Sequence, residues 1–571
     1  MAVDLPSYNL LDEGWIPCLR LEVDGRAGER PAPRMLGLTE TLTEANRIVE
    51  IEGDTPLETV SIIRLLLAIL YRCVDVSSME SWRTLWESRR FPKEAIDVYL
   101  ERHRQRFDLF DAARPFYQCA SVPMESAGTV SKLLYQADNN TTLFDHAIVA
   151  SPPALRPDKV ARSLLVIQAF DTSGTKSGNR AEKIAPASPL VQSAVIVFRG
   201  STLFETLMLN LCRYSPDRDG EPWEFRARDD LPAWERDASS TADDRMPSGF
   251  CDLLTWQSRR ALVRPEFQPD GAVVVRHATV MKGAGLAAGF ERRNRETMLA
   301  FRQAREPKAS ESAWYPMRFV EDRALWRDCL ALFSSVPDDS SRSKGSQWLA
   351  ALQDEGVLPR RSLQPVDVYG LATEKAKCLF WRHEQMTIPA SLVADENAGW
   401  RVKDALDIAE RVAPILSAQS VRQAAADGRP RTMASALAVL AWGLVKYEED
   451  LERSLAGLRP AQRRRLARLI AELSPGRRFW ANLAMPFQQF LEDLSASVGP
   501  GSHTDATSRW RGAVRTAAID AFGSIAERVG VRGHALRAVA VGDRIFRHQL
   551  KLALEDDSHI REGGTHDGTT A

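Results

Sequence analysis

Apolar residues recur at helical spacing in a segment that starts near residue 55 and sets the first clear helix of the chain. Thr55 can cap this helix, Pro56 suits its first position, and Glu58 is placed to complete a capping box. The apolar positions that follow keep the three-to-four-residue period of a buried helix face; they are Val60, Ile63, Leu66, Leu67 and Leu70. Further helices are predicted over 92–106, 158–170, 201–213, 292–305 and 321–334.

Alternating apolar residues around turn dipeptides predict two hairpins instead. Trp15-Ile16-Pro17 begins a strand that runs toward the turn Asp24-Gly25, with the indole as a buried structural anchor. Leu262-Val263 and Val273–Val275 flank the turn Pro269-Asp270-Gly271 in the same way. Residues 335–347 are rich in serine and aspartate and predict a surface loop.

The pattern changes after about residue 400, where strand signals end and alanine, leucine, arginine and glutamate dominate. Helices are predicted over 400–426, 431–456, 460–473, 479–496 and 508–555, the last broken near Gly530 and Gly533. Short connections between helices of this length favour an antiparallel bundle. The predicted fold class is therefore α+β: a large mixed domain (1–398), an antiparallel bundle of about four helices (399–555) and a disordered tail (556–571).

The composition says little about the fold, but it limits the kinds of partner and the cellular setting that we expect. Lys and Arg number 75 against 76 Asp and Glu, so the net charge is -1, and any contact with nucleic acid must come from a local patch or from partners. The seven cysteines contain no C-x-x-C, which argues against a disulfide framework or a zinc knuckle. The start has no signal-peptide pattern, and the apolar stretch 433–445 is too short to span a bilayer, so we expect a cytoplasmic protein.

No motif in the sequence supplies an obvious chemistry. The loop Gly174–Gly178 contains a Lys-Ser pair but lacks the glycine before lysine that a Walker A motif needs. The sequence also lacks H-E-x-x-H and the G-x-S-x-G elbow, so we expect no catalytic residue, no metal and no cofactor. The loop itself is open to two interpretations, an ordinary turn or a close contact with a nucleic-acid backbone.

Two groups of basic residues near the C-terminus are likewise open to two interpretations. A solvated helix face and a patch that follows DNA phosphates both fit their spacing. The groups are Arg463, Arg464, Arg465 and Arg468, then Arg537, Arg544, Arg547 and Lys551.

Several blocks, in order, resemble one family, CasA, the large subunit of the type I-E CRISPR surveillance complex Cascade. The resemblance spans almost the whole chain and rests on the order of blocks that are each weak alone. They are Asn9–Pro17, Arg114–Gln118, Lys132–Leu134 leading to Phe144, Gly174–Gly178, Phe198–Gly200, Gly249-Phe250 with Trp256-Gln257, and Tyr369-Gly370 with Arg382–Glu384.

The resemblance implies a non-catalytic subunit that works with other Cascade subunits and a CRISPR guide RNA. In that family the large subunit recognises the protospacer-adjacent motif (PAM) of target double-stranded DNA from the minor groove. It also promotes duplex opening and R-loop formation, and it recruits a helicase-nuclease. Guide pairing reads the target sequence in such complexes, so the protein reads only the PAM.

The resemblance also implies which residues carry these roles. The glycine loop against the PAM matches Gly174, Thr175, Lys176 and Ser177, and the wedge that opens the duplex matches Glu374, Lys375 and Ala376. Lys176 and Ser177 replace common glycines, and Lys375 replaces the usual glutamine. A basic PAM-reading residue is expected between Lys282 and Arg293, assigned to Arg292 and Arg293. The long loop near the guide RNA matches the segment from about 145 to 158, with contacts assigned to Phe144, Asp145 and His146.

Two other functions compete with this one. The low net charge and absent motifs permit a protein-interaction scaffold with no direct DNA role. A nucleotide-binding enzyme that uses the 174–178 loop is the third hypothesis.

Overall fold

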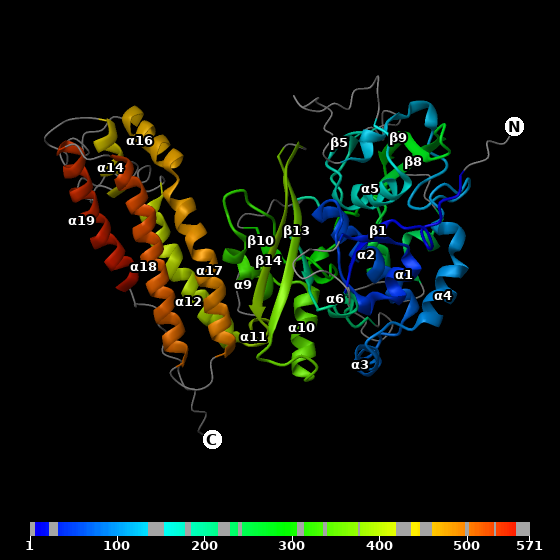
Figure 1. Cartoon of the computed structure of the whole chain (residues 1–571), viewed down its shortest axis with the longest axis horizontal. Coiled ribbons are helices and arrows are strands. Elements are labelled where there is room, and N and C mark those ends of the chain that lie inside the picture. The colour runs from blue at the N-terminus through cyan, green and yellow to red at the C-terminus, as the bar shows by residue number, and fades with distance from the viewer. Residues whose placement is uncertain are drawn as a thin grey trace. The chain divides into compact units, whose positions relative to one another are not determined.

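A computed structural model describes most of the chain and divides it into two compact units, Met1–Ala394 and Asp395–Ala571 (Figure 1). The described residues are 6–21, 32–134, 153–176, 184–214, 229–237, 242–304, 313–334, 340–374, 377–417, 436–445, 460–496, 502–529 and 533–555. The predicted disordered tail, 556–571, lies outside them.

The first unit combines helices with several small sheets, which confirms a mixed α+β fold. Its helices are α1 (Leu38–Thr43), α2 (Pro56–Cys73), α3 (Met79–Ser88), α4 (Lys93–Arg102), α5 (Pro157–Phe170), α6 (Leu203–Asn210), α8 (Phe250–Leu254), α9 (Cys329–Phe333), α10 (Lys344–Asp354) and α11 (Ser391–Ala394). Short 3₁₀ turns include η2 (Arg104–Phe107), η4 (Val130–Leu133), η7 (Arg292–Asn294) and η8 (Leu325–Asp328).

The strands of this unit form antiparallel sheets of two or three strands each. The strand orders are β2-β1-β3, β4-β9-β8, β5-β6, β11-β10-β12 and β14-β13-β7. The strands are β1 (Ile16–Arg20), β2 (Arg34–Leu36), β3 (Ile48–Ile51), β4 (Gly128–Thr129), β5 (Gly174–Thr175), β6 (Ile184–Ala185), β7 (Val195–Phe198), β8 (Arg259–Phe267), β9 (Val273–Lys282), β10 (Phe301–Gln303), β11 (Trp314–Pro316), β12 (Ser340–Ser341), β13 (Leu363–Glu374) and β14 (Lys377–Pro389).

Helix α2 forms the centre of the first unit, because every residue from Leu57 to Leu70 is buried and α4, α5, α6 and α8 pack on it. Thr55 caps the helix as predicted, by accepting from the Glu58 backbone N–H. The predicted capping box is wrong, however. The Glu58 carboxylate accepts instead from Arg162 Nε at 2.9 Å, on α5, and from Lys159. The carboxylate still reaches back to the helix start, but it accepts from the Asp54 backbone N–H at 3.3 Å and not from that of Thr55, and the tertiary ion pairs are added to this local contact.

The first predicted strand is confirmed, with Trp15 fully buried and its indole donating to the Leu10 carbonyl at 3.0 Å. The second hairpin is confirmed as β8 and β9. The predicted helix over 292–305 is wrong, because the chain there forms the turn η7 and then strand β10, which pairs with β11 and β12. The predicted loop over 335–347 is interrupted by β12, and α10 begins within it at Lys344.

The second unit is helical in its described residues, which fits the predicted C-terminal bundle. Its helices are α12 (Glu396–Val412), α14 (Ala436–Val445), α16 (Pro460–Leu473), α17 (Pro475–Ala496), α18 (Ser502–Val529) and α19 (Gly533–Glu555). Helices α17 and α18 run side by side (Figure 1), and α12, α14 and α19 also pack with α18. Trp510 of α18 is buried against Phe487 and Phe490 of α17. The predicted boundary after residue 398 falls in the first turn of α12.

Candidate nucleic-acid interface

The glycine loop follows the end of α5 at Phe170, and one buried arginine, Arg259, hydrogen-bonds to the backbone on both sides of it. The Arg259 side chain is completely buried and donates to carbonyls on both sides of the loop, Thr172 at 3.3 Å and Pro186 at 2.8 Å. It also forms an ion pair with the Asp171 carboxylate. Because a guanidinium offers five donors in a fixed plane, this one residue fixes both stems of the loop.

Gly174 lies in β5 and pairs with Ala185 of β6. Its φ of +148° is a conformation that L side chains rarely adopt, whereas a Cβ added there would meet no atom within 4 Å. The backbone conformation, and not lack of space, therefore requires glycine here. Ser177 lies outside the described residues.

Lys176 follows β5 and folds back onto its own loop. Its ammonium lies 2.7 Å from Asp171 Oδ2, and its side chain is 17% exposed. The Asp171 carboxylate is therefore shared between Lys176 and the buried Arg259.

A second lysine, Lys132, comes from a different element and interacts electrostatically with Lys176. Lys132 belongs to η4, which packs against β9 and α5. Burial lowers the pKa of the Lys132 ammonium, and the positive charge of Lys176 lowers it further. In the sequence, Lys132 stands out only as part of the Lys132–Leu134 block, and no local motif links it to the glycine loop.

Lys282, at the C-terminal end of β9, lies beside the base of the same loop. It pairs directly with Arg259 in the β8–β9 ladder, so the two backbones are within about 6 Å. The Lys282 ammonium lies 3.6 Å from Asp244 Oδ1. The fold therefore places the backbone of Lys282 beside Arg259, at the base of the loop that carries Lys176.

The two arginines assigned as PAM readers, Arg292 and Arg293, lie in η7. Burial lowers the pKa of Arg292; the neighbouring charge of Glu296 opposes the shift, and that of Arg64 adds to it. The Arg292 Nε and Nη2 atoms are buried without a hydrogen-bond partner in the described structure. The Arg293 guanidinium lies 4.3 Å from the centre of the Trp314 ring.

The wedge residues fall at the end of the longest hairpin of the first unit. Strands β13 and β14 pair along their whole length up to Glu374 and Lys377. Lys375 and Ala376 connect these two residues in the sequence and lie outside the described structure. Behind the tip, Leu379 and Trp381 are 51% and 42% exposed on β14, which is the edge strand of its sheet.

The guide-RNA residues, Phe144, Asp145 and His146, also lie outside the described structure. The described end of that segment is fixed by a bridge between Leu155 and Val275 of β9. Asp158 follows at the start of α5 and accepts from Arg156 and Arg162.

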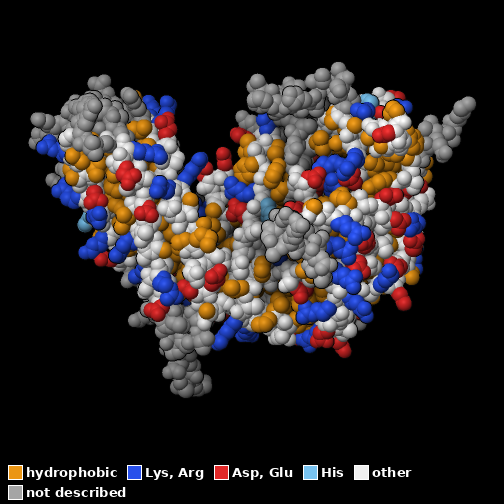
Figure 2. Space-filling model, in the orientation of Figure 1, with side chains coloured by type: hydrophobic (Ala, Val, Ile, Leu, Met, Phe, Trp, Pro, Cys, Tyr) orange, Lys and Arg blue, Asp and Glu red, His pale blue; other side chains and the backbone are white. Residues whose placement is uncertain are grey.

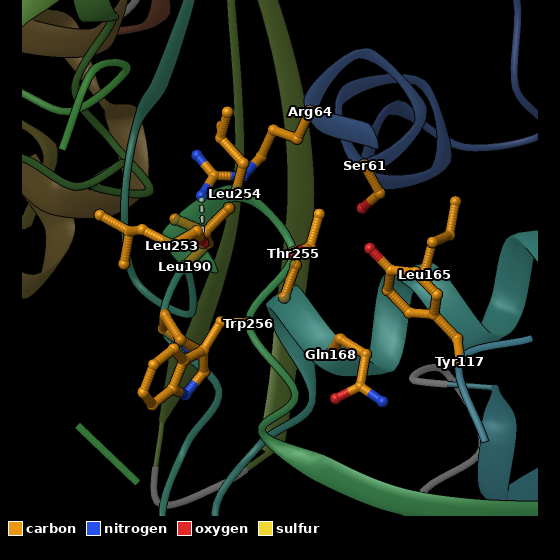
Figure 3. Close-up of a pocket in the computed structure, with 12 residues that line it drawn as sticks. Ser61, Arg64, Tyr117, Leu165, Gln168, Leu190, Leu253, Leu254, Thr255 and Trp256 are labelled. Carbon is orange, nitrogen blue, oxygen red and sulfur yellow. Dashed lines mark hydrogen bonds between the residues drawn. The ribbon is translucent and has the colours of Figure 1, made fainter. Parts of the chain in front are cut away.

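A small cavity lies between α2, α5 and α8 in the first unit. Its volume is about 30 Å³, and Ser61, Tyr117, Gln168 and Thr255 line it with Arg64, whose guanidinium donates to the Leu253 carbonyl (Figure 3). Pockets for small-molecule ligands are about tenfold larger. This cavity has room for water and gives no support to the nucleotide-binding hypothesis.

Charges of both signs alternate over the visible face of each unit (Figure 2), as the near-zero net charge leads one to expect. Within the described residues, no group of three His, Cys, Asp or Glu side chains could hold a metal ion. The helices of that same part of the chain include none that is long and apolar enough to cross a membrane.

Comparisons with known proteins match this chain to one family, over nearly its full length. The family model for CRISPR-associated protein Cse1 matches residues 9–521. The protein CasA/Cse1 from Thermus thermophilus is 31% identical over 561 residues, which cover 96% of this chain and 98% of that protein.

Solved structures show the same fold. Cse1 from Acidimicrobium ferrooxidans matches with a TM-score of 0.75 at 24% identity, over 96% of this chain and 98% of that one. CasA (Cse1) from Thermus thermophilus matches with a TM-score of 0.72 at 26% identity, over 95% and 99%. A chain of a CRISPR RNA-guided surveillance complex matches with a TM-score of 0.68 at 20% identity, over 95% and 100%.

Proposed function

The chain belongs to the family of CRISPR-associated protein Cse1, and on that premise we propose that it is the large subunit of an RNA-guided surveillance complex. The observation that carries this proposal is the 31% identity to CasA/Cse1 over 96% of the chain. The similarity in fold to a chain of such a complex supports it. The partners would be the other subunits of the complex and its guide RNA.

Within the complex, we propose that the subunit recognises the PAM of target double-stranded DNA from the minor groove. The subunit would then promote duplex opening and R-loop formation, and would recruit a helicase-nuclease, without catalysis of its own. A glycine loop that is fixed by the buried Arg259 and carries the partly exposed Lys176 supports a DNA contact, since attraction to phosphates can come from a local group of cations in a chain of near-zero net charge.

The proposed site residues keep the roles that the resemblance implies. They are Gly174, Thr175, Lys176 and Ser177 for the groove, Glu374, Lys375 and Ala376 for the wedge, Arg292 and Arg293 for PAM reading, and Phe144, Asp145 and His146 for the guide RNA. The Nε and Nη2 atoms of Arg292 are buried, so the surrounding turn would have to open before these atoms reached DNA, and the Arg293 guanidinium would have to leave the ring of Trp314.

The test uses the assembled complex with its guide RNA and a short duplex that contains the PAM. We expect charge reversal, Lys176→Glu and Lys375→Glu, to weaken binding, because each replaces attraction to phosphate by repulsion. Lys93→Glu, on the exposed surface of α4, is the matched control for the change in net charge. Unchanged affinity with both lysines reversed would overturn the site assignment, and a complex that forms without binding DNA would favour a scaffold.

A further inference from the structure

Strand β14 presents one exposed face behind the tip of the longest hairpin of the first unit. Its residues alternate between exposed and half-buried from the tip onward, so Lys377, Leu379, Trp381, His383 and Gln385 share the exposed face. Leu379 is 51% exposed and Trp381 is 42% exposed. Figure 2 shows hydrophobic side chains gathered over the half of this hairpin that is nearer its tip. Neighbouring exposed apolar side chains of this size, on a regular strand, mark a candidate binding surface.

The neighbouring strand β13 holds this face in one conformation. Trp381 lies directly opposite Leu371 of β13, which is buried. His383 lies directly opposite the buried Tyr369, and the two rings stack with centroids 4.5 Å apart and planes 9° from parallel. The His383 Nε2 atom lies 3.0 Å from Asp367 Oδ1. Because the backbone and the neighbouring rings are fixed before a ligand arrives, binding to this face costs little ordering entropy.

The two faces of β14 differ in charge. None of the five residues on the exposed face is acidic, and Lys377 places an ammonium at the tip end, opposite Glu374 in the ladder. The other face carries Glu384, whose carboxylate is used within the protein. It accepts from Arg382 at 3.1 Å and from the Leu325 backbone N–H at 2.9 Å. The exposed face therefore suits a ligand that combines apolar surface with negative charge.

Unpaired nucleotides have this combination. Each base offers a flat face that stacks on an aromatic ring, and each phosphate carries a negative charge. Side chains on one face of a strand are about 7 Å apart, so Leu379 and Trp381 give two contact positions in a line that leads away from the tip. A protein strand that joined the edge of the sheet would instead bond to the backbone of β14, which needs no exposed ring.

We propose that Leu379 and Trp381 form a stacking surface for unpaired bases of the DNA that the subunit opens. This inference rests on the proposed function, and it assigns single-stranded DNA to a face that begins directly behind the wedge at the tip of the hairpin. Unstacking of bases costs free energy, and stacking on a protein ring returns part of it only in the opened state. The surface therefore stabilises the open duplex and does not strengthen the first contact with the PAM.

The first experiment compares DNA that can open with DNA that cannot. In the assembled complex with its guide RNA, affinity is measured for a PAM duplex that matches the guide and for the same duplex with its strands covalently cross-linked next to the PAM. Trp381→Ala should weaken binding of the free duplex roughly tenfold and leave binding of the cross-linked duplex unchanged. Trp400→Ala is the matched control, because Trp400 is 44% exposed on α12 of the second unit. Equal weakening of both duplexes would overturn the stacking surface.

The second experiment tests whether the ring itself stacks on a base. A fluorescent base analogue that is quenched by stacking replaces a base next to the PAM, in each strand in turn, and its emission is measured in the bound complex. Emission from one strand should rise with Trp381→Ala and with Trp381→Leu and stay near the native value with Trp381→Phe, since leucine keeps apolar surface without a ring. Leu379→Phe adds a ring and should strengthen binding of the free duplex roughly fivefold. Full quenching with Trp381→Leu would show that no ring is needed and that stacking is wrong.

The outcomes separate this inference from the function on which it rests. If the complex binds the PAM duplex and no change at Trp381 or Leu379 alters affinity or emission, the stacking surface is wrong and the proposed function stands. If the native complex binds neither duplex, the proposed function is wrong and the inference falls with it. Should Trp381→Ala keep the subunit out of the complex while Trp381→Leu assembles, the face is covered by a protein partner, which overturns the inference. A lower melting temperature of the free Trp381→Ala chain would overturn it too, because the ring would then pack within this chain.

Discussion

Different kinds of interaction stabilise the interior of each of the two units. In the first unit, buried ion pairs join segments far apart in the sequence, as in Arg64–Glu296, whose side chains are 5% and 1% exposed. Arg162–Glu58 and Arg259–Asp171 are buried in the same way. In the second unit, ion pairs such as Lys403–Asp407 lie on helix surfaces, and the core is apolar.

The difference follows from how each unit provides hydrogen-bond partners for its backbone N–H and C=O groups. Helices bond their own backbone groups, so the second unit needs only apolar faces that meet, such as the stacked rings of Phe522 and Phe546 at 4.3 Å. Small sheets and loops leave carbonyls to be satisfied individually. A buried arginine does this with directional donors, and Arg259 shows it at the glycine loop. The candidate site lies on the unit that depends on buried charge.

The largest expected effect is the loss of a buried charge in the first unit. Glu296→Ala should lower the free energy of unfolding by about 4–5 kcal/mol, because it leaves Arg64 buried without its carboxylate, near a second buried guanidinium, Arg292. Chemical denaturation of the full chain measures it.

The double variant Arg64→Met with Glu296→Leu is the control for this prediction. Apolar replacement of both partners should recover most of the lost stability, since it removes the desolvation cost together with the pair. If Glu296→Ala costs less than about 1 kcal/mol, the first unit does not depend on this pair and the comparison fails.

The next effect concerns the apolar core of the second unit. Trp510 is 1% exposed, packs against Phe487 and Phe490, and donates from its indole to the Ala405 carbonyl at 2.7 Å. Trp510→Ala should cost about 3–4 kcal/mol through the cavity it leaves. Trp510→Phe should cost clearly less, because apolar contact and much of the volume are kept, and thermal unfolding of both variants measures the difference. Equal costs would show that the hydrogen bond, and not packing, holds this core.

The same contrast explains what could be predicted from the sequence. The spacing of apolar residues and a proline at the start were enough to place α16 at Pro460–Leu473, because a helix is a local structure with one repeating period. The fold class followed from the change in pattern after residue 400. Even Trp15 could be identified as a buried anchor from its neighbours.

The predictions that were wrong concern residues whose conformation or contacts depend on partners distant in the sequence. Residues near 301 resembled a helix, but Phe301 pairs across a sheet with Pro316 and Ser341. Glu58 fitted a capping box, yet Arg162 offered its carboxylate a stronger, charged partner. Lys132 gave no sequence signal as a neighbour of Lys176, because only the packing of η4 against α5 and β9 brings them together.

The smallest expected effect is on the pH dependence of stability, to which the ionised forms of two acids, Glu296 and Asp404, contribute with opposite signs. Burial disfavours the charged Glu296, but the charge and hydrogen bonds of Arg64 outweigh it and hold its pKa below the usual range. In Asp404, on α12, burial and then the charge of Asp407 raise the pKa. Ionised Glu296 therefore stabilises the folded state above its unfolded pKa of about 4.3, and this stability is lost as pH falls through the lower folded value. Ionised Asp404 instead destabilises the folded state at neutral pH, and acid removes that cost.

Replacing each acid by its neutral amide distinguishes the contributions of Glu296 and Asp404 to stability. At pH 7, Glu296→Gln should melt at a lower temperature than the native chain, and Asp404→Asn at a slightly higher one. The Asp404→Asn difference should shrink as pH falls toward 4, because the raised pKa of Asp404 brings the native side chain to the neutral state first. The Glu296→Gln difference should persist down to about pH 4.3 and disappear only as pH falls further, through the lower folded pKa of Glu296. Calorimetry across this pH range measures both. A stabilising Glu296→Gln or a destabilising Asp404→Asn would reverse the comparison, because the Glu296 charge would then destabilise the first unit and the Asp404 charge would stabilise the second.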